Sequence, residues 1–378
     1  ISDEDATALR DAMKAYASGK PEEGDQHRAR IANPVAAKLA TWHRLRSGFG
    51  SAADYRAFLD ANPAWPERRL LTQRYEEALF IGGGNAPQIR AAFAKGGPDH
   101  GAGFAALAST YLAEGKTEDA RKHAVKAWRD MTLGAKFETG FLARFGSLLT
   151  LADHKARLDR LIIDDVRYKD DRNSRAATAK RVIALLPEVE RKRAEARLAV
   201  FMQQKGALTL IQKAPASDTA DWGFTFHKIQ ALRRADKIDE AATIMLTVPT
   251  APGAVNNNDE WWIERRTLAY ASLRKGKPKL AYEIVSDAGP PTINPHTDQS
   301  FMAGWIALRY LKDPAKAKQH FATMQKAADG PLSRAKANYW VGRTAEALKD
   351  KSAALAAYTE ATLDRDAFHA LLALQKID

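Results

Sequence analysis

Residues 261–374 decide the fold, and they contain the segments WWIERR (261–266), AGWIALR (303–309) and SRAKANYWVGR (333–343). Apolar residues recur through this stretch with the period of an α-helix, so each helix carries one apolar face. The residues that share a face are Phe301, Trp305 and Leu308, then Ala317, Phe321 and Met324, and then Ala354, Tyr358 and Ala361. One helical hairpin cannot bury such a face alone, so we expect successive hairpins to stack against each other.

Short polar breaks mark the turns of these hairpins. They lie at Gly115-Lys116, Asp236-Lys237, Gly276-Lys277, Asp313-Pro314 and Asp350-Lys351. The last four are about 40, 37 and 37 residues apart, a period typical of tetratricopeptide-like repeats. Gly115 and Gly276 can adopt the left-handed conformation that ends a helix, and Asp313 can cap the helix that Pro314 opens. We predict an all-α fold, an α-solenoid of stacked helix-turn-helix repeats that forms a curved superhelix or ring with a concave surface.

The composition supports a helical protein and restricts its partners. Of the 378 residues, 45% are hydrophobic and 28% are charged, which suits a folded, α-rich chain. The 58 Lys and Arg against 46 Asp and Glu give a net charge of +12, which favours association with a polyanion. Acids and bases alternate along the helices, as Glu188 and Lys192 do, and no nucleic-acid-binding motif accompanies them. We therefore expect no nucleic-acid partner.

The chain has no cysteine, which excludes disulfides, thiolate zinc sites and cysteine nucleophiles and is compatible with the periplasm. No apolar run is long enough to span a membrane. The chain begins at Ile1 rather than at methionine, so we expect a mature or trimmed product whose export signal has been removed.

The three segments quoted first resemble the end of the superhelical region of soluble lytic murein transglycosylases. LARFG (142–146), ADHKARLD (152–159) and residues 110–128 resemble the middle of the same region. The resemblance covers about residues 62–374 and rests on the order of these segments along the chain. It implies a periplasmic protein that binds peptidoglycan, because this family cleaves the bond between N-acetylmuramic acid and N-acetylglucosamine and leaves 1,6-anhydromuramoyl ends.

The resemblance also implies that the catalytic residues lie outside this chain. The family's lysozyme-like catalytic domain would begin at about the position where this chain stops, Asp378. The family's Glu-Ser signature and its later Gly-Leu-Met-Gln element do not occur in the sequence. A catalytic carboxyl group needs a raised pKa in a shaped cleft, and the local pattern around Glu264 or Glu346 supplies no partner for one. We expect this chain alone to be inactive, although it resembles part of an enzyme.

We expect no cofactor and no metal site. The nine histidines form no His-Glu-x-x-His pattern, and His123, His154 and His320 fall in separate repeats. The segments Gly82-Gly83-Gly84 and Gly96-Gly97-Pro98 lack the preceding strand and the Gly-Lys-Ser/Thr ending of a phosphate-binding loop, so we interpret both as turns.

We expect an N-terminal helical segment, residues 1–60, that continues into an α-superhelical repeat domain, residues 61–378. Ser2 can cap a first helix whose first turn carries the acids 3–5, all favourable near its positive end. The prolines within residues 63–66 interrupt the chain near the boundary, but we predict continuous stacking across it rather than an independent domain.

The tryptophans of the repeats lie within apolar helical patterns. We interpret Trp261, Trp262, Trp305 and Trp340 as core residues rather than as platforms on which sugar rings stack.

Near the end of the chain, Trp340, Arg343, Phe368 and His369 are our candidates for contact with a catalytic domain outside the chain. Residues 368–371 read FHAL where the family would have an aromatic-Tyr-Gly sequence, so this junction can pack differently.

Two hypotheses of function follow. The leading one is the superhelical scaffold of a periplasmic lytic transglycosylase, which holds peptidoglycan beside the catalytic domain. The alternative is a noncatalytic helical-repeat adaptor that binds a protein partner in its concave surface. A catalytic Glu-Ser segment downstream would favour the first hypothesis, and a saturable protein ligand would favour the second.

Overall fold

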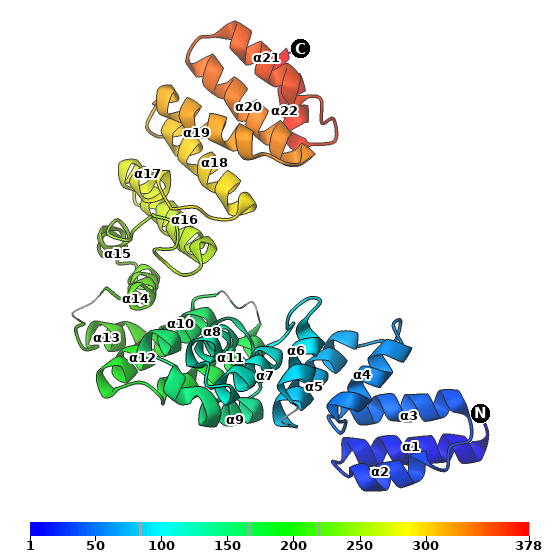
Figure 1. Ribbon diagram of the computed structural model, residues 1–378. Helices are drawn as coiled ribbons and strands as arrows, with labels where there is room; N and C mark the ends of the chain where they lie inside the picture. Colours follow the sequence, from blue (N-terminus) through cyan, green and yellow to red (C-terminus); the bar gives the residue numbers. More distant parts are fainter. Residues whose placement is uncertain (83–84, 165, 167, 218–219, 378) are drawn as a thin grey trace. The chain divides into compact units, whose positions relative to one another are not determined.

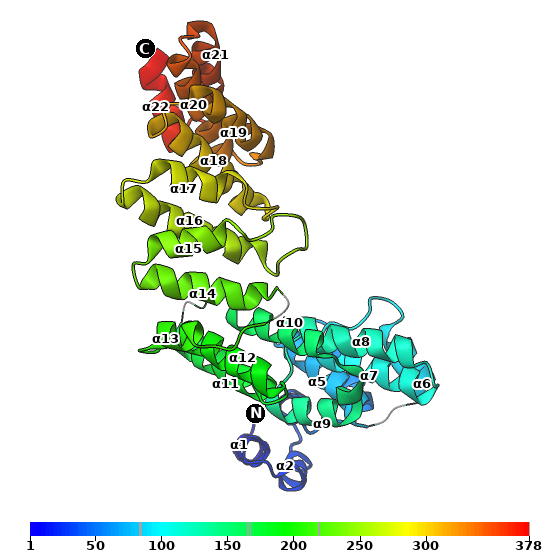
Figure 2. The same cartoon turned by 90° about the vertical axis from the view of Figure 1, so that its left-hand side faces the viewer.

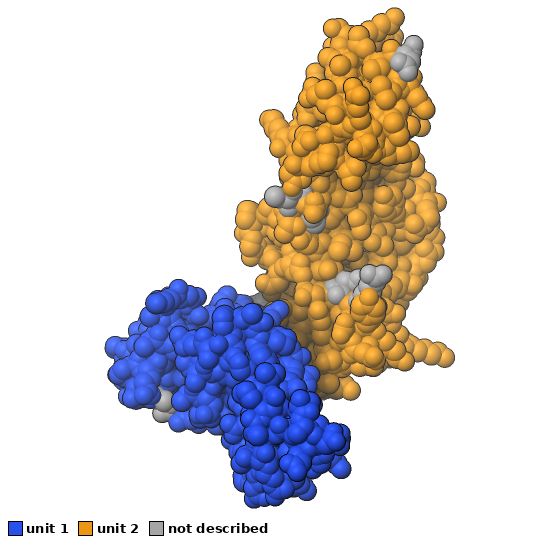
Figure 3. All heavy atoms as spheres, turned by 90° about the vertical axis from the view of Figure 1, so that its right-hand side faces the viewer, with its two compact units in different colours: residues 1–157 blue, residues 158–378 orange. Residues whose placement is uncertain are grey.

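The computed structural model describes residues 1–82, 85–164, 166, 168–217 and 220–377. These residues form 22 α-helices and one short 3-10 helix, and no strand occurs among them (Figure 1). The all-α prediction is therefore confirmed. The chain divides into two compact units, unit 1 (Ile1–Arg157) and unit 2 (Leu158–Asp378), which Figure 3 colours separately.

Unit 1 consists of consecutive short helices. They are α1 (Asp3–Ala17), α2 (Pro21–Arg28), α3 (Pro34–Arg46), α4 (Ala52–Ala61), α5 (Arg68–Ile81), α6 (Ala86–Phe93), α7 (Gly101–Ala113), α8 (Thr117–Asp130), α9 (Ala135–Phe145), η1 (Gly146–Leu148) and α10 (Leu151–Ile162), which continues into unit 2.

Unit 2 contains the helices predicted from the repeats. They are α11 (Lys169–Ile183), α12 (Glu188–Phe201), α13 (Ala207–Gln212), α14 (Trp222–Arg234), α15 (Ile238–Met245), α16 (Asn258–Arg274), α17 (Pro278–Ser286), α18 (Ile293–Arg309), α19 (Pro314–Ala327), α20 (Pro331–Ala347), α21 (Lys351–Ala361) and α22 (Phe368–Ile377). From α14 onward the hairpins lie one on another in chain order (Figure 2).

The hairpin turns share one backbone geometry. Gly115 and Gly276 have φ of 72° and 71°, as predicted, and each stands two residues before the second helix of its hairpin. In each turn the next backbone N–H donates to a carbonyl five residues earlier, 2.9 Å for Lys116 and 2.9 Å for Lys277. The predicted cap at Asp313 also forms, because its carboxylate accepts from the Lys316 N–H at 3.0 Å.

Three turns use the same left-handed conformation without glycine. Asp236, Lys312 and Lys349 have φ of 60°, 57° and 63°. Non-glycine side chains adopt this conformation at a cost in free energy, because their Cβ crowds the backbone. The sequence pattern located these turns but gave no sign of which residue would take the positive φ.

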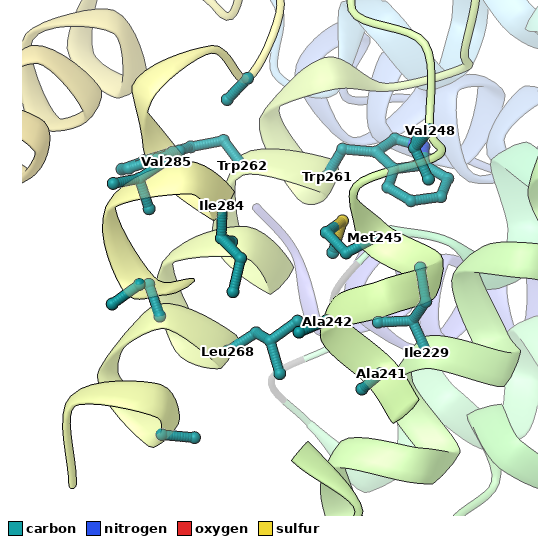
Figure 4. Close-up of a cluster of buried hydrophobic side chains, with 14 of the residues drawn as sticks. Ile229, Ala241, Ala242, Met245, Val248, Trp261, Trp262, Leu268, Ile284 and Val285 are labelled. Atoms are coloured by element: carbon teal, nitrogen blue, oxygen red, sulfur yellow. The ribbon is translucent and has the colours of Figure 1, made fainter. Parts of the chain in front are cut away.

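One apolar cluster joins the hairpins from α14 to α18. Trp261 and Trp262 are each 1% exposed. They pack among Ile229, Met245, Leu268, Ile284 and Val285 (Figure 4). The interpretation of these two tryptophans as core residues is correct. Trp305 and Trp340 are partly buried and pack against a second apolar cluster, which includes Ala317, Phe321 and Met324.

Buried arginines tie the ends of neighbouring helices together. Arg265, 3% exposed, donates to the carbonyl oxygens of Ile284, Val248 and Met245 at 3.0, 3.3 and 3.5 Å. Arg157 has the same role in unit 1. It donates to the backbone carbonyl oxygen of Trp128 at 2.7 Å, and its guanidinium lies over the indole ring of that residue. Cationic donors at helix C-termini satisfy carbonyls that have no partner within the helix.

The N-terminal segment begins with the predicted cap, since Ser2 Oγ accepts from the Asp5 N–H at 3.1 Å. Near residue 60, α4 packs on α5 through Phe58, Leu59 and Leu71, which share one apolar cluster. The boundary between residues 60 and 61 stays a prediction. Gly97 has φ of 74°, as a turn requires.

Gly82 follows the end of α5, whereas Gly83 and Gly84 lie outside the described residues. The interpretation of that glycine run as a turn therefore stays a prediction.

Candidate functional site

Partly exposed aromatic and basic side chains run across the first helices of successive hairpins in unit 2. They are Arg266 on α16, Phe301 on α18, Lys336 and Trp340 on α20, and His369 on α22, and we call them the aromatic-cationic face. Contacts between neighbouring helices connect them, as follows.

The α16 and α18 helices meet at Asp298. Its Oδ2 atom accepts from Arg266 Nη1 at 2.7 Å and from the indole N–H of Trp262 at 3.1 Å. The carboxylate thus fixes the Arg266 guanidinium at the surface, where the side chains of both ion-pair partners remain about one third exposed (39% and 32%).

The α18 and α20 helices meet through a lysine placed on an aromatic ring. Lys336 Nζ lies 3.5 Å from the centroid of the Phe301 ring, close enough for a cation–π interaction. Burial lowers the pKa of Lys336, and the charge of Asp298 opposes part of that change. Among the described residues, no carboxylate lies within ion-pair distance of this ammonium group.

Trp340 completes the aromatic part of the face. Its ring stacks on Phe321 at 5.7 Å between centroids and meets Phe301 edge-on at 5.7 Å. Its indole N–H is buried and has no hydrogen-bond partner within the part of the chain that the structure describes.

The α20 and α22 helices meet around Tyr339. The Tyr339 hydroxyl accepts from Arg343 Nη1 at 3.1 Å, and its ring lies 5.6 Å from the His369 ring. Burial lowers the pKa of His369, and the positive charge of Lys336 lowers it further. At neutral pH the imidazole is therefore uncharged and can both donate and accept a hydrogen bond.

Three of the four candidate residues from the sequence thus come together. Trp340, Arg343 and His369 surround Tyr339, whereas Phe368 is 66% exposed and contacts only the ring of its neighbour His369 among the aromatic groups described. Lys336 was missed, because a lysine on an apolar helix is ordinary in sequence and only the packing of α18 puts a phenyl ring beneath it.

The two acids considered from the sequence are held in ion pairs. Glu264, 3% exposed, binds the Arg233 guanidinium through both oxygens, at 2.5 and 2.9 Å. Burial would raise the pKa of Glu346, but the Tyr358 hydroxyl and the Lys376 ammonium stabilise the carboxylate and lower the pKa overall. A general acid requires the opposite shift.

A carboxyl group with a raised pKa exists elsewhere, in unit 1. Burial raises the pKa of Glu76, although its carboxylate accepts from the backbone N–H groups of Asp99, His100 and Gly103 at 2.9, 2.9 and 3.0 Å. These donors open α7, so Glu76 acts as a cap supplied by another helix. Nothing in the sequence connects Glu76 with a helix start more than twenty residues away.

The three histidines from separate repeats pack locally. His123 stacks on Tyr111 at 5.1 Å, His154 meets Trp128 edge-on at 5.5 Å, and His320 hydrogen-bonds Tyr282 at 2.9 Å. In the described ranges, no group of His, Asp and Glu side chains is arranged to hold a metal ion. No helix within these ranges is both long and apolar enough to cross a membrane.

Comparison of the sequence with protein-family models and with curated proteins finds no match. Solved structures do match the fold. The lytic transglycosylase Slt from Pseudomonas aeruginosa, solved as an inactive mutant, has a TM-score of 0.57 and 15% sequence identity over 98% of this chain. The 70 kDa soluble lytic transglycosylase Slt70 from Escherichia coli has a TM-score of 0.47 and 14% identity over 99% of this chain and 58% of that one.

At 15% identity, the likeness to the Pseudomonas aeruginosa chain shows a shared helical fold. This chain spans 57% of the length of that protein.

Proposed function

We propose that this chain is the helical scaffold of a periplasmic peptidoglycan lytic transglycosylase, and that it holds peptidoglycan beside a catalytic domain outside these 378 residues. The observation that carries the proposal is the fold shared with the Pseudomonas aeruginosa lytic transglycosylase over 98% of this chain. The sequence segments that resemble the superhelical region of that family support it independently.

The aromatic-cationic face suits a glycan strand that bears peptides. The partly exposed aromatic side chains of this face can bind the apolar faces of sugars. Lys336 and Arg266 can pair with the carboxylates of the peptides. The net charge of +12 favours approach to such a polyanion.

In this proposal the catalytic domain contacts the chain at Trp340, Arg343, Phe368 and His369. Phe368 is the clearest of these, because its ring is 66% exposed at the start of α22. In this arrangement the chain binds and positions the peptidoglycan, and the other domain supplies the catalytic carboxyl group.

The test is to incubate the chain with purified peptidoglycan sacculi, measure the protein retained on the pellet, and examine the soluble fraction by mass spectrometry. We expect retention without release of 1,6-anhydromuropeptides. Release of these products would place a catalytic carboxylate within the chain and overturn the scaffold assignment. Failure of the folded chain to bind sacculi, together with saturable binding of a protein ligand, would support an adaptor instead.

Matched lysine variants locate the binding surface. Lys336→Met should weaken retention, because the ammonium on the Phe301 ring would be lost. Lys326→Met, an exposed position on α19, removes the same charge from the neighbouring helix and should leave retention nearly unchanged. Equal retention of both variants would remove the aromatic-cationic face from the proposal.

A further inference from the structure

Unit 1 contains a cavity of about 850 Å³ that the proposed function does not use. Four segments line it: the loop before α4 with the start of that helix (residues 47–53 and Tyr55), the second half of α5, Gln88 on α6, and α9 with the residue before it. The volume lies in the range of roughly 300 to 1,000 Å³ typical of small-molecule sites, so it can hold one or two sugar rings.

Aromatic rings form the apolar part of this cavity. Phe49 and Phe137 line it from the loop and from α9, and both are partly exposed. The nearly buried Phe80 supports Phe137, with 4.8 Å between the ring centroids. Two partly exposed rings on separate segments suit a flat ligand that has apolar faces.

Polar side chains of α5 and α6, together with Lys136 of α9, form much of the rest. Arg74 Nη1 donates to Glu77 at 2.7 Å, and Glu77 also accepts from Gln73 at 3.0 Å. Arg74 Nε is buried and has no partner in the described part of the chain, no hydrogen bond joins Nη2 to the residues described there, and the side chain is 36% exposed. The exposed carboxamide of Gln88 likewise has no partner there.

This combination selects among ligand classes. An apolar chain would cover the Nη2 donor of Arg74 without satisfying it, which is costly. Glu77 pairs with the Arg74 guanidinium, so the two nearly cancel and the exposed Lys136 on α9 is the one further charge among the lining residues described. An anion would still meet the Glu77 carboxylate beside the guanidinium. A neutral ligand with apolar faces and strong carbonyl acceptors satisfies both parts of the wall.

We propose that this cavity binds an N-acetylated amino sugar of a glycan strand, with the ring between Phe49 and Phe137 and the acetamido carbonyl accepting from the Arg74 guanidinium. The inference deepens the proposed function and rests on it for the choice of glycan. It places a sugar subsite in unit 1, separate in sequence from the aromatic-cationic face of unit 2.

Gly140 allows the cavity to be closed without unfolding the protein. It lies within α9, lines the cavity and is exposed, and a Cβ added there meets no atom within 4 Å. Glycine is a poor residue inside a helix, so Gly140→Trp should keep or raise the unfolding temperature while its ring fills the cavity. The control is Thr139→Trp, an exposed neighbour that does not line the cavity.

Arg74→Lys tests the hydrogen-bonding role. Lysine keeps the positive charge near Glu77 but lacks the planar set of donors. The substitution should therefore lower affinity for an acetamido sugar while leaving stacking on Phe49 and Phe137 in place.

The experiment is isothermal titration calorimetry of the full chain with tetra-N-acetylchitotetraose, and with cellotetraose as the probe that lacks acetamido groups. We expect chitotetraose to bind at least about tenfold more tightly than cellotetraose, the factor that corresponds to roughly one hydrogen bond. Gly140→Trp should abolish the tighter binding of chitotetraose, Thr139→Trp should preserve it, and Arg74→Lys should remove the preference for chitotetraose.

Three results would overturn the inference: no binding of chitotetraose to the unmodified chain, equal binding of both probes, or full binding by a folded Gly140→Trp variant. Retention on sacculi, measured on the same protein, separates this failure from that of the proposed function. If the chain binds sacculi but not chitotetraose, only the subsite is refuted. If the chain binds chitotetraose but not sacculi, the subsite is supported and the scaffold is refuted.

Discussion

Arg265 shows how a single buried cation holds several helices of unit 2 together. Burial lowers its pKa to about 10, so the guanidinium stays charged at neutral pH. Arg265→Met removes the donors to the Ile284, Val248 and Met245 carbonyls and leaves them buried without partners. We expect the free energy of unfolding to fall by about 3 kcal/mol, measured by urea denaturation with circular dichroism.

The neighbouring Arg266 is the matched control. Its ion pair with Asp298 lies at the surface, where such pairs contribute about 0–1 kcal/mol. Arg266→Met should therefore change stability by no more than about 1 kcal/mol. Equal losses for the two variants would mean that burial and carbonyl contacts do not set the contribution of Arg265.

His227 makes stability depend on pH. It is fully buried, and burial together with the charge of Arg197 lowers its pKa from 6.5 to about 3. The ring nitrogens face two carbonyls, that of Ile162 at 3.1 Å from Nε2 and that of Gly223 at 3.0 Å from Nδ1, and a neutral imidazole can donate to one of them. If Nε2–H donates to Ile162, Nδ1 accepts from Arg197 Nε at 3.4 Å.

Between about pH 6.5 and 3 the unfolded state takes up a proton at this histidine and the folded state does not. Above pH 6.5 His227 therefore does not make stability depend on pH. As the pH falls below 6.5, the free energy of unfolding falls by about 1.4 kcal/mol per pH unit. His227→Gln should reduce the slope of stability against pH between pH 6 and pH 4.5 by about this amount. An unchanged slope would show that His227 is protonated in the fold.

At the scale of elements, the residue with positive φ in each turn affects how much its hairpin contributes to the free energy of unfolding. Gly276 adopts φ of 71°, so Gly276→Ala should reduce the free energy of unfolding by about 1 kcal/mol. Lys349 adopts φ of 63° with an exposed side chain, so Lys349→Gly should increase it by about 0.5–1 kcal/mol. Urea denaturation measures both changes. The same sign for the two variants would contradict the argument from the left-handed conformation.

The sequence predicts those features that depend on neighbours along the chain. Helical periodicity identified the buried Trp261 and Trp262, and the glycine at position 276 marked a turn. The partners of Arg265 could not be predicted, because its three carbonyls belong to other segments that only packing brings near. The same holds for the cavity in unit 1, where Phe49, Arg74 and Phe137 meet from distant positions.

At the scale of the whole molecule, the net charge of +12 should affect binding to sacculi. Salt screens charges over about 10 Å at 0.1 M and about 3 Å at 1 M, so retention should decrease between these concentrations. Stacking on rings and hydrogen bonds to sugars do not depend on long-range charge, so part of the retention should persist. Complete loss at about 1 M salt, measured by pelleting, would mean that nonspecific attraction accounts for binding.

The exposed end of α22 bears on how the scaffold works with a second domain. Phe368 and Leu371 are 66% and 53% exposed, while Ala373 and Leu372 pack against the preceding hairpin. Phe368→Ala should therefore leave the unfolding temperature of this chain unchanged. If the catalytic domain covers the ring, the lost burial of about 1.5–3 kcal/mol should weaken association with that domain by roughly ten- to a hundredfold.

Val35→Ala, at a side chain 68% exposed on α3 of unit 1, supplies the control for the loss of an exposed apolar group. Calorimetry with the separately produced catalytic domain should then distinguish the two variants, with Val35→Ala binding like the unmodified chain. If Phe368→Ala also binds without loss, the domain contact must lie on another surface, and the exposed ring of Phe368 has no part in it. A weaker complex with an unchanged unfolding temperature would locate the junction at α22, because only a contact made in the complex can be lost without cost to the isolated fold.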